Sequence, residues 1–190
     1  MRLLRLAFAG MFAAAAMAMP AAAGTDDFLT VQLKDGPVVI QLMPEVAPKH
    51  VAQVKALAAK GAYDNVVFHR VIKGFMAQTG DVEFGKQGGA SFNPARAGTG
   101  GSDLPDLPAE FSKVPFERGT VGMARSQSPN SANSQFFIMF DQGSFLNGQY
   151  TVIGKVVSGM ENVDKIKRGE GGNGEVSNPD KMIKVSVGKN

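Results

Sequence analysis

The stretch Phe68-His69-Arg70-Val71-Ile72-Lys73-Gly74-Phe75-Met76-Ala77-Gln78-Thr79-Gly80-Asp81 sets one arginine among large apolar side chains. A guanidinium group keeps its proton in proteins, so a half-buried arginine needs hydrogen-bond acceptors or a chemical role. A second strand-like run follows at residues 134–138, where Gln135 alternates onto the same face as Phe137. Together the two runs supply large apolar side chains and one cationic group, which is what an apolar pocket with a single polar group requires.

Short strand-like runs separated by turn residues dominate the rest of the chain. Residues 28–33 and 37–42 flank Asp35-Gly36, a strong hairpin signal, and should form adjacent antiparallel strands. Short strands joined by turns favour a mainly β fold in which an antiparallel sheet closes on itself. Further strands are expected at residues 66–72, 75–79, 120–124, 136–140, 151–157 and 182–187.

Two helices are expected beside the sheet. Pro48 suits the first turn of a helix that carries an apolar stripe and stops at Gly61. A second helix is expected over residues 160–168, opened by a capping box at residues 158–161. The segment 82–107 is rich in Gly and Pro and lacks periodicity, which predicts an ordered surface loop or a flexible flap.

Five further motifs lie between these runs or after them: Met123-Ala124-Arg125-Ser126, Pro129-Asn130-Ser131-Ala132-Asn133-Ser134, Gly98-Thr99-Gly100-Gly101, Phe145-Leu146-Asn147-Gly148 and Val152-Ile153-Gly154-Lys155-Val156. With these motifs the chain resembles the cyclophilin family of peptidyl-prolyl cis-trans isomerases over residues 28–187, and the first two motifs resemble its bacterial exported branch. The resemblance implies a closed eight-stranded antiparallel barrel, capped by an α-helix at each end, that works without a cofactor.

The resemblance also implies functional residues, with Arg70 and Gln78 in the catalytic role. Gln78 and Gln135 are the natural hydrogen-bond acceptors for a desolvated arginine. Without the resemblance, Arg70 would sooner be interpreted as a structural arginine, and the apolar residues as ordinary core. The pocket that holds the substrate's proline ring is implied to comprise Phe75, Met76, Ala124, Gln135, Phe137, Phe145, Leu146 and Tyr150.

Strand alternation refines this assignment. It places Arg70 on one face with Phe68 and Ile72, and His69 on the other, so the arginine and the histidine should point apart. A histidine among valines is more often a core residue than a base. Alternation also separates Phe75 from Met76, so Phe75 joins the pocket only if it lies at the twisted start of its strand.

Three positions depart from the best-known members of the family. Lys73 stands where proline is usual, Phe145 stands where many eukaryotic members carry tryptophan, and Tyr150 stands where they carry histidine. Losing the indole removes apolar surface and an N–H donor, so weak cyclosporin binding is expected. The segment 123–129 is also one residue longer than in those members. The alignment of residues 125–127 with the backbone that contacts substrate in the family is therefore open by one position.

The N-terminus has the composition of an export signal. Two arginines precede an apolar stretch at residues 6–19, and residues 21–23 offer a small-x-small cleavage site. The stretch is short for a membrane span and no basic residue closely follows it, so no stable membrane anchor is expected. We therefore expect a signal peptide at residues 1–23 and one isomerase domain at residues 24–190, in the periplasm or secreted.

Composition excludes several other classes. The formal net charge is +3, and removal of the two N-terminal arginines leaves 18 basic and 17 acidic residues, or +1, so nucleic acid is not an expected partner. The chain has no cysteine and two histidines, which excludes thiol catalysis and predicts no metal site. Residues 80–87 approach a phosphate-binding loop, but Gln87 lacks the required hydroxyl, and Asp81 and Glu83 would repel phosphate.

The predicted function is rotation of X-Pro peptide bonds in folding exported proteins, by a monomer acting on proline-containing polypeptides. A hydrogen bond from Arg70 to the prolyl nitrogen would favour the twisted transition state. One alternative is a proline-peptide-binding or chaperone module with incidental isomerase activity. Retention of Arg70 favours the enzyme, because proline recognition alone needs aromatic groups and no cation. A lipocalin-type ligand barrel fits poorly, since the apolar strands would fill its interior.

Overall fold

The structure is a computed structural model that describes residues 27–188 of the 190-residue chain. The predicted signal peptide, residues 1–23, lies outside the described residues. Among residues 27–188, no helix combines the length and the apolar character that a membrane crossing requires.

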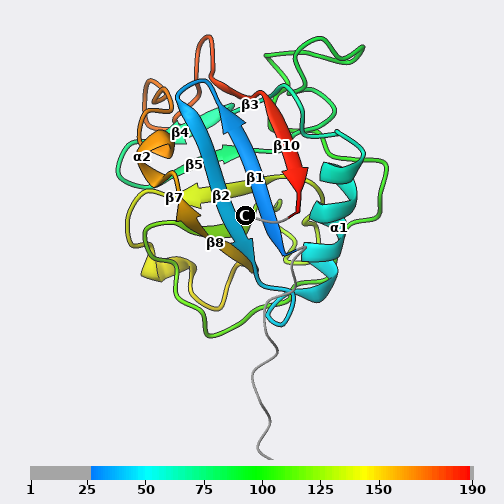
Figure 1. Ribbon diagram of the computed structural model, residues 1–190, viewed down its shortest axis with the longest axis vertical. Helices are drawn as coiled ribbons and strands as arrows, with labels where there is room; N and C mark the ends of the chain where they lie inside the picture. Colours follow the sequence, from blue (N-terminus) through cyan, green and yellow to red (C-terminus); the bar gives the residue numbers. More distant parts are fainter. Residues whose placement is uncertain (1–26, 189–190) are drawn as a thin grey trace, which may run out of the picture.

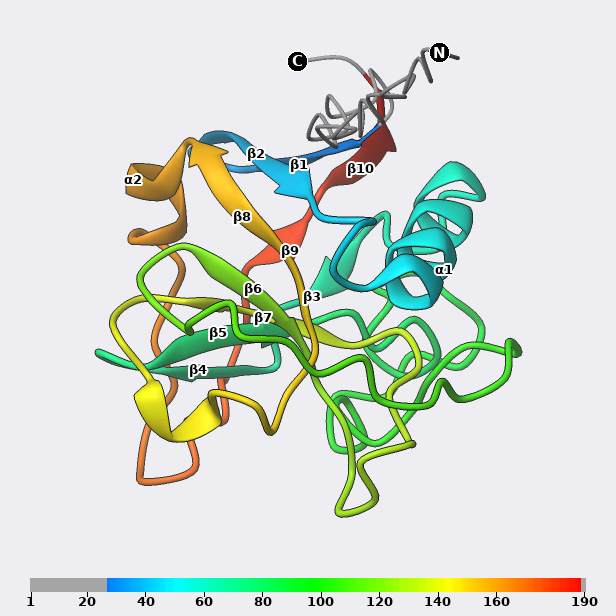
Figure 2. The same ribbon diagram turned by 90° about the horizontal axis from the view of Figure 1, so that it is seen from below.

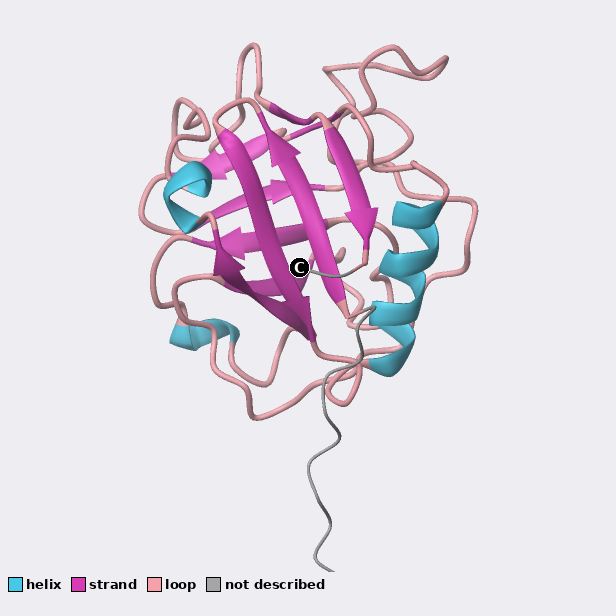
Figure 3. Ribbon diagram, viewed as in Figure 1, coloured by secondary structure: helices cyan, strands magenta, loops and turns pink. Residues whose placement is uncertain are grey.

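Eight antiparallel strands form one strongly curled sheet (Figure 1). The strand order is β10-β1-β2-β8-β6-β7-β5-β4, and the curl makes β1, β2 and β10 cross steeply in front of β4, β5 and β7 (Figure 3). This agrees with the mainly β prediction. The strands are β1 Phe28–Leu33, β2 Gly36–Leu42, β4 Arg70–Ile72, β5 Met76–Thr79, β6 Thr120–Met123, β7 Phe136–Met139, β8 Val152–Ser158 and β10 Lys184–Val187.

The hairpin between β1 and β2 forms as predicted, but its turn lies one residue earlier. Leu33 pairs directly with Gly36, so the two loop residues are Lys34 and Asp35. Gly36 has φ +136°, and a Cβ there would lie 2.7 Å from the Asn162 amide nitrogen. Glycine is therefore required by both the backbone conformation and the close approach of the chain.

The predicted closed barrel is wrong, because the sheet is an open half-barrel. Its edge strands, β4 and β10, do not pair with each other. The strand expected over residues 66–72 is interrupted at Phe68 and His69, and its first part, β3 (Val66–Val67), pairs with β9 (Lys181–Met182) in a separate two-stranded sheet. The residues expected to form one strand are thus divided between two sheets.

The interruption also changes the faces of the side chains. Phe68 is buried in the main core, whereas Ile72 packs on a smaller apolar cluster, so the predicted common face for Phe68, Arg70 and Ile72 is wrong. Beyond the break, the outer edge of β4 bonds to a glycine-rich loop. Val71 N–H donates to Gly174 O (2.7 Å), and Gly169 N–H donates to Val71 O (2.9 Å).

The first predicted helix is confirmed as α1 (Pro48–Ala59), with proline in its first turn. Its N-cap residue, Ala47, offers no side-chain acceptor. The Glu110 carboxylate fills this role from a distant loop, accepting the backbone N–H groups of Lys49 and His50 at 3.1–3.2 Å. The N–H groups at the start of the helix are therefore partly satisfied across tertiary structure.

The second helix is shorter than predicted. α2 spans only Met160–Val163, and its N-cap is Gly159 in a left-handed conformation, with no side-chain cap bond, so the predicted capping box does not form. A Cβ at Gly159 would lie 2.1 Å from Pro37 O, so contact with β2 determines how the helix begins. After α2 the chain turns toward the edge of β4 instead of continuing as helix to residue 168.

Two apolar clusters lie on opposite faces of β7. Phe136 belongs to the main core and meets Tyr63 edge-on at 5.6 Å between ring centroids. Phe137 belongs to the smaller cluster and stacks on Phe116 at 5.7 Å. Figure 2 shows α1 at one end of the molecule, and the short 3-10 helix η1 (Ser144–Leu146) beside β4 and β5. The predicted alternation of Phe136 and Phe137 is confirmed.

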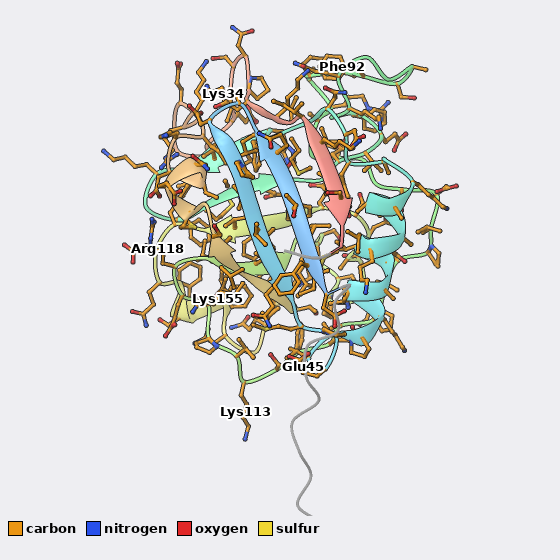
Figure 4. The ribbon with its side chains drawn as sticks, in the orientation of Figure 1. Lys34, Glu45, Phe92, Lys113, Arg118 and Lys155 are labelled. Carbon is orange, nitrogen blue, oxygen red and sulfur yellow. The ribbon has the colours of Figure 1, made fainter. Side chains whose placement is uncertain are left out.

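Lys113 and Arg118 lie at the edge of the molecule in the view of Figure 4. Lys34 pairs with Asp180 at 2.7 Å, and Arg118 pairs with an aspartate at 2.6 Å. Exposed pairs of this kind stabilise a fold by about 0–1 kcal/mol each, so the fold depends mainly on its two apolar clusters.

Candidate active site

A cavity of about 280 Å³ opens between the β4 side of the sheet and η1. Nine of the ten site residues named from the sequence line it, and Arg125 joins them. Gln135 lines an adjoining cavity of about 460 Å³, which it shares with Gln78. The nine residues are Arg70, Phe75, Met76, Gln78, Ala124, Phe137, Phe145, Leu146 and Tyr150.

Arg70 is held by two neutral acceptors. β4 and β5 pair so that Arg70 lies directly opposite Gln78. Its Nη1 donates to Gln78 Oε1 (3.3 Å), and its Nε donates to the backbone carbonyl of Asn173 (2.9 Å). Within residues 27–188, Nη2 has no hydrogen-bond partner and no carboxylate forms an ion pair with the guanidinium. The arginine is therefore fixed in place while it keeps its charge and free N–H donors.

The two glutamines form a chain instead of a pair of acceptors for Arg70. Gln78 accepts from Arg70 as predicted, and its own Nε2 donates to Gln135 Oε1 (3.0 Å). The prediction that Gln135 accepts from Arg70 is wrong, because Gln78 lies between them. Gln135 Nε2 donates to the carbonyls of Gly98 (3.0 Å) and Gly100 (2.8 Å).

The apolar wall combines buried and exposed side chains. Met76, Phe137 and Leu146 are 2%, 5% and 7% exposed, so their positions are fixed by packing. Phe75 precedes β5 and reaches the same cavity from the turn, which meets the condition that alternation set for it. Phe145 is 66% exposed and its ring contacts Phe75 at 5.4 Å between centroids. The wall is thus rigid at its base and open at its mouth.

Arg125 is a site residue that the sequence reasoning did not select. Its guanidinium lies 4.4 Å above the centre of the Tyr150 ring, and its Nη2 donates to Gln149 O (3.1 Å). Tyr150 in turn meets Phe137 edge-on at 5.9 Å. Arg125 therefore connects the loop after β6 to the segment after η1 and supports the Tyr150 side of the cavity. The sequence did not reveal this contact, because the alignment of residues 125–127 with the family was open by one position.

Asn173 is the second residue that the sequence did not reveal. It acts through its backbone carbonyl, which any residue type would offer, so no side-chain pattern identifies it. The only local signal is the surrounding run of glycines. Gly174 is held at φ +73°, where a Cβ would lie 2.4 Å from Ile72 Cγ1. This close approach places the Asn173 carbonyl against Arg70.

His69 lies away from the cavity, as expected. Both ring nitrogens are buried, and a Cβ on Gly98 would lie 2.7 Å from His69 Cδ2, so the ring packs beneath the 82–107 loop. Desolvation by burial lowers the pKa of His69 to about 4, against a smaller opposing effect of Asp81. At neutral pH the ring is uncharged and packs as part of the interior. Within residues 27–188, no group of three or more His, Cys, Asp or Glu side chains could hold a metal ion.

Comparisons with known proteins agree with this geometry. The family model of the cyclophilin type peptidyl-prolyl cis-trans isomerases matches residues 28–187. A Brucella suis protein named "Probable peptidyl-prolyl cis-trans isomerase" is 67% identical over 167 residues, covering 87% of this chain and 85% of its own. A Brucella abortus protein of the same name is 66% identical with the same coverage.

Solved structures give the same result. The crystal structure of cyclophilin AquaCyp293 from Hirschia baltica superposes with a TM-score of 0.72 at 26% identity, covering 87% of this chain and 75% of that chain. A cyclophilin type peptidyl-prolyl cis-trans isomerase of Cryptosporidium parvum, crystallised in the presence of the dipeptide Ala-Pro, gives 0.73 at 27% identity, covering 86% and 99%. The chain therefore belongs to the cyclophilin family. It is a peptidyl-prolyl cis-trans isomerase of the cyclophilin type.

The opposite faces of β7 generate a first prediction. Phe136→Ala should destabilise the fold by about 3–5 kcal/mol, because it removes a ring from the main core. Phe137→Ala should lower peptide binding and turnover by about 10-fold or more, because the cavity loses its central wall and water enters beside Arg70. The measurements are the thermal midpoint, which reports the loss of stability, and peptide turnover, which reports the loss of activity, for both variants. A folded but inactive Phe136→Ala beside an unfolded Phe137→Ala would contradict this assignment of faces.

A second prediction tests the Asn173 contact. Gly174→Ala should lower turnover by roughly 3- to 10-fold, because the clash with Ile72 moves the neighbouring carbonyl away from Arg70 Nε. Gly171→Ala is the matched control, since Gly171 has a similar φ of +71° but nothing within 4 Å of its added Cβ. Equal losses in both variants would assign the effect to backbone strain and remove the role given to the carbonyl.

Proposed function

We propose that this isomerase rotates X-Pro peptide bonds of folding proteins outside the cytoplasm, with Arg70 as the catalytic residue and Gln78 as its support. The observation that carries the proposal is the placement of Arg70. Its guanidinium lines an apolar cavity, donates to two neutral acceptors and forms no ion pair within residues 27–188. Such a group can donate a charge-assisted hydrogen bond to a substrate atom that enters the cavity.

The proposed chemistry needs no covalent step. Rotation of a peptide bond costs about 18–20 kcal/mol, because resonance delocalises the nitrogen lone pair into the carbonyl. A hydrogen bond from Arg70 to the prolyl nitrogen favours a pyramidal nitrogen with a localised lone pair, which exists only in the twisted transition state. The planar amide nitrogen is a poor acceptor, so the bond stabilises the transition state more than the ground state.

The proline ring is proposed to occupy the cavity of about 280 Å³. Met76, Phe137 and Leu146 supply its buried apolar surface, and Phe75 and Phe145 form the edge. The Ala-Pro dipeptide used with the Cryptosporidium protein supports proline-containing peptides as the ligand class. We also propose a monomer as the working unit, since the ten side chains that line the cavity suffice for the proposed chemistry.

We also propose weak cyclosporin binding. Phe145 presents an exposed ring at the mouth of the cavity, but a phenyl ring lacks the N–H donor of an indole. An isothermal titration with cyclosporin would test this point, and binding as tight as that of tryptophan-containing members would contradict it.

A third prediction tests the role of Arg70. Arg70→Ala should lower turnover by about 10- to 100-fold with the fold intact, which is the effect of losing about 1.5–3 kcal/mol of charge-assisted hydrogen bonding. Arg70→Lys should rescue little, because an ammonium cannot contact Gln78, Asn173 and a substrate atom in one plane. Turnover of a short X-Pro peptide is the measurement.

Arg118→Ala provides the matched control. Arg118 also pairs through a guanidinium, but its partner is Asp164, and its side chain is 48% exposed outside the cavity. Its removal should leave turnover within about 2-fold, since exposed ion pairs contribute little. Full activity in Arg70→Ala would remove the catalytic role, and a loss that only follows unfolding would make Arg70 structural.

Export is a separate part of the proposal, supported by the charge and apolar pattern of residues 1–23. Expression of the full chain in a bacterial host, followed by cell fractionation and N-terminal mass analysis, tests it. The expected product begins at Gly24 and appears in the periplasm or medium. A cytoplasmic product that retains the first 23 residues would contradict export without affecting the isomerase activity.

A further inference from the structure

We propose that Asp81 is a positioning residue for catalysis. It stands at the start of a series of hydrogen bonds that ends at Arg70, and it determines whether the oxygen or the NH₂ group of each glutamine amide points toward the arginine. Asp81 does not line the cavity and touches neither Arg70 nor the proposed substrate position. It acts through the 98–100 segment, Gln135 and Gln78. This inference rests on the role proposed above for Arg70.

The Asp81 side chain is completely buried, with 0% exposure. A buried carboxylate is costly unless hydrogen bonds replace its lost hydration. Asp81 Oδ1 accepts the backbone N–H groups of Glu83 (3.1 Å) and Phe84 (2.9 Å). Oδ2 accepts those of Gly98 (2.7 Å) and Gly100 (3.0 Å). The carboxylate therefore joins the start of the long loop, residues 83–84, to its 98–100 segment.

The geometry of the 98–100 segment then determines the orientation of Gln135. With their N–H groups directed at Asp81, Gly98 and Gly100 present their carbonyls to Gln135 Nε2 at 3.0 and 2.8 Å. A carbonyl oxygen only accepts, so the NH₂ end of Gln135 has to face these two groups. Its Oε1 is consequently directed the other way, toward Gln78.

The same reasoning continues to the arginine. Gln135 Oε1 can only accept, and Gln78 Nε2 donates to it at 3.0 Å. Gln78 Oε1 is therefore the end that faces Arg70 Nη1. If Gln78 were reversed, its NH₂ group would oppose the guanidinium N–H groups and repel them. A buried carboxylate thus ensures that Arg70 meets an acceptor.

The close packing around Asp81 supports a fixed geometry. A Cβ on Gly100 would lie 2.6 Å from Asp81 Oδ1, and a Cβ on Gly85 would lie 2.7 Å from Asp81 O. The approach at Gly85, with φ +90° at Gly80 and a Cβ there 2.6 Å from Ser134 O, accounts for the two glycines of the run at residues 80–87 that resembles a phosphate-binding loop. The backbone N–H groups in this segment surround a carboxylate of the same chain instead of a phosphate.

The experiment is a double-mutant cycle between Asp81→Asn and Gln135→Met, measured by kcat and KM on a short X-Pro peptide. Asp81→Asn replaces one acceptor oxygen by a donor and should lower kcat by roughly 5- to 20-fold, with KM changed less than about 2-fold. Gln135→Met removes both hydrogen-bonding ends at similar volume. If Asp81 acts through Gln135, the double variant should lose no more than the larger single loss.

Multiplied losses in the double variant would show that Asp81 is only structural and would overturn the inference. The matched control is Asn93→Ala, which removes another side-chain acceptor of the same loop, the one that receives Ala95 N–H at 3.1 Å. It should keep kcat within about 2-fold. A loss in Asn93→Ala equal to that in Asp81→Asn would assign the effect to general loosening of the loop and would also overturn the inference.

If Asp81→Asn does not fold, Gly85→Ala takes its place, because the added Cβ would lie 2.7 Å from Asp81 O and 3.3 Å from Asp81 Cβ and would displace the carboxylate without touching either glutamine. The side-chain NH₂ groups of Gln135 and Gln78 should then exchange faster than in the wild-type protein. Unchanged exchange rates would overturn the inference. Full activity in Arg70→Ala would instead remove the proposed catalytic role itself, so the two failures are distinguishable.

Discussion

The hydrogen bonding of Arg70 is the constraint on which the rest of the site depends. A carboxylate partner would hold the guanidinium but compete with the substrate for its charge, and water alone would leave it mobile. The structure uses two neutral acceptors, Gln78 Oε1 and Asn173 O, which belong to segments on either side of β4. Asn173 lies 103 residues further along the chain, so the site cannot form until the C-terminal loop packs on the sheet.

This requirement gives a physical reason for the open edge of the sheet. β5 already occupies one hydrogen-bonding side of β4, and a regular partner strand would occupy the other side with a continuous ladder. The structure has a glycine-rich loop there instead, which makes one bridge between Arg70 and Glu175 and bonds to Val71 through Gly169 and Gly174. An irregular loop can turn a single carbonyl toward the arginine side chain. Closure of the barrel would replace that loop with ladder bonds, which accounts for why the prediction of a closed barrel failed.

The sequence predicted the side chains of the site better than the backbone that holds them. The resemblance to the family was enough to place Arg70, Gln78 and Phe137 at one cavity, because its motifs are identified by their side chains. The Asn173 carbonyl has no such signature, since every residue carries one. The short length of α2 and the break at Phe68 were not predicted for a related reason. Both depend on close approaches of backbone segments that are distant in sequence, such as Gly159 against Pro37 O.

In the proposed mechanism the apolar wall has to contribute as well, because one hydrogen bond is not enough. The uncatalysed cis–trans exchange of an X-Pro bond takes roughly 10–100 s. Bringing it to milliseconds requires lowering the activation barrier by about 5.5–7 kcal/mol. A charge-assisted hydrogen bond nets about 1.5–3 kcal/mol, so most of the difference has to come from holding the ring and excluding water. Rotation needs one side of the bond fixed and the other free to move. Met76, Phe137 and Leu146 are nearly inaccessible and can fix the proline ring, whereas Phe145 at the rim is 66% exposed and leaves the preceding residue room to turn.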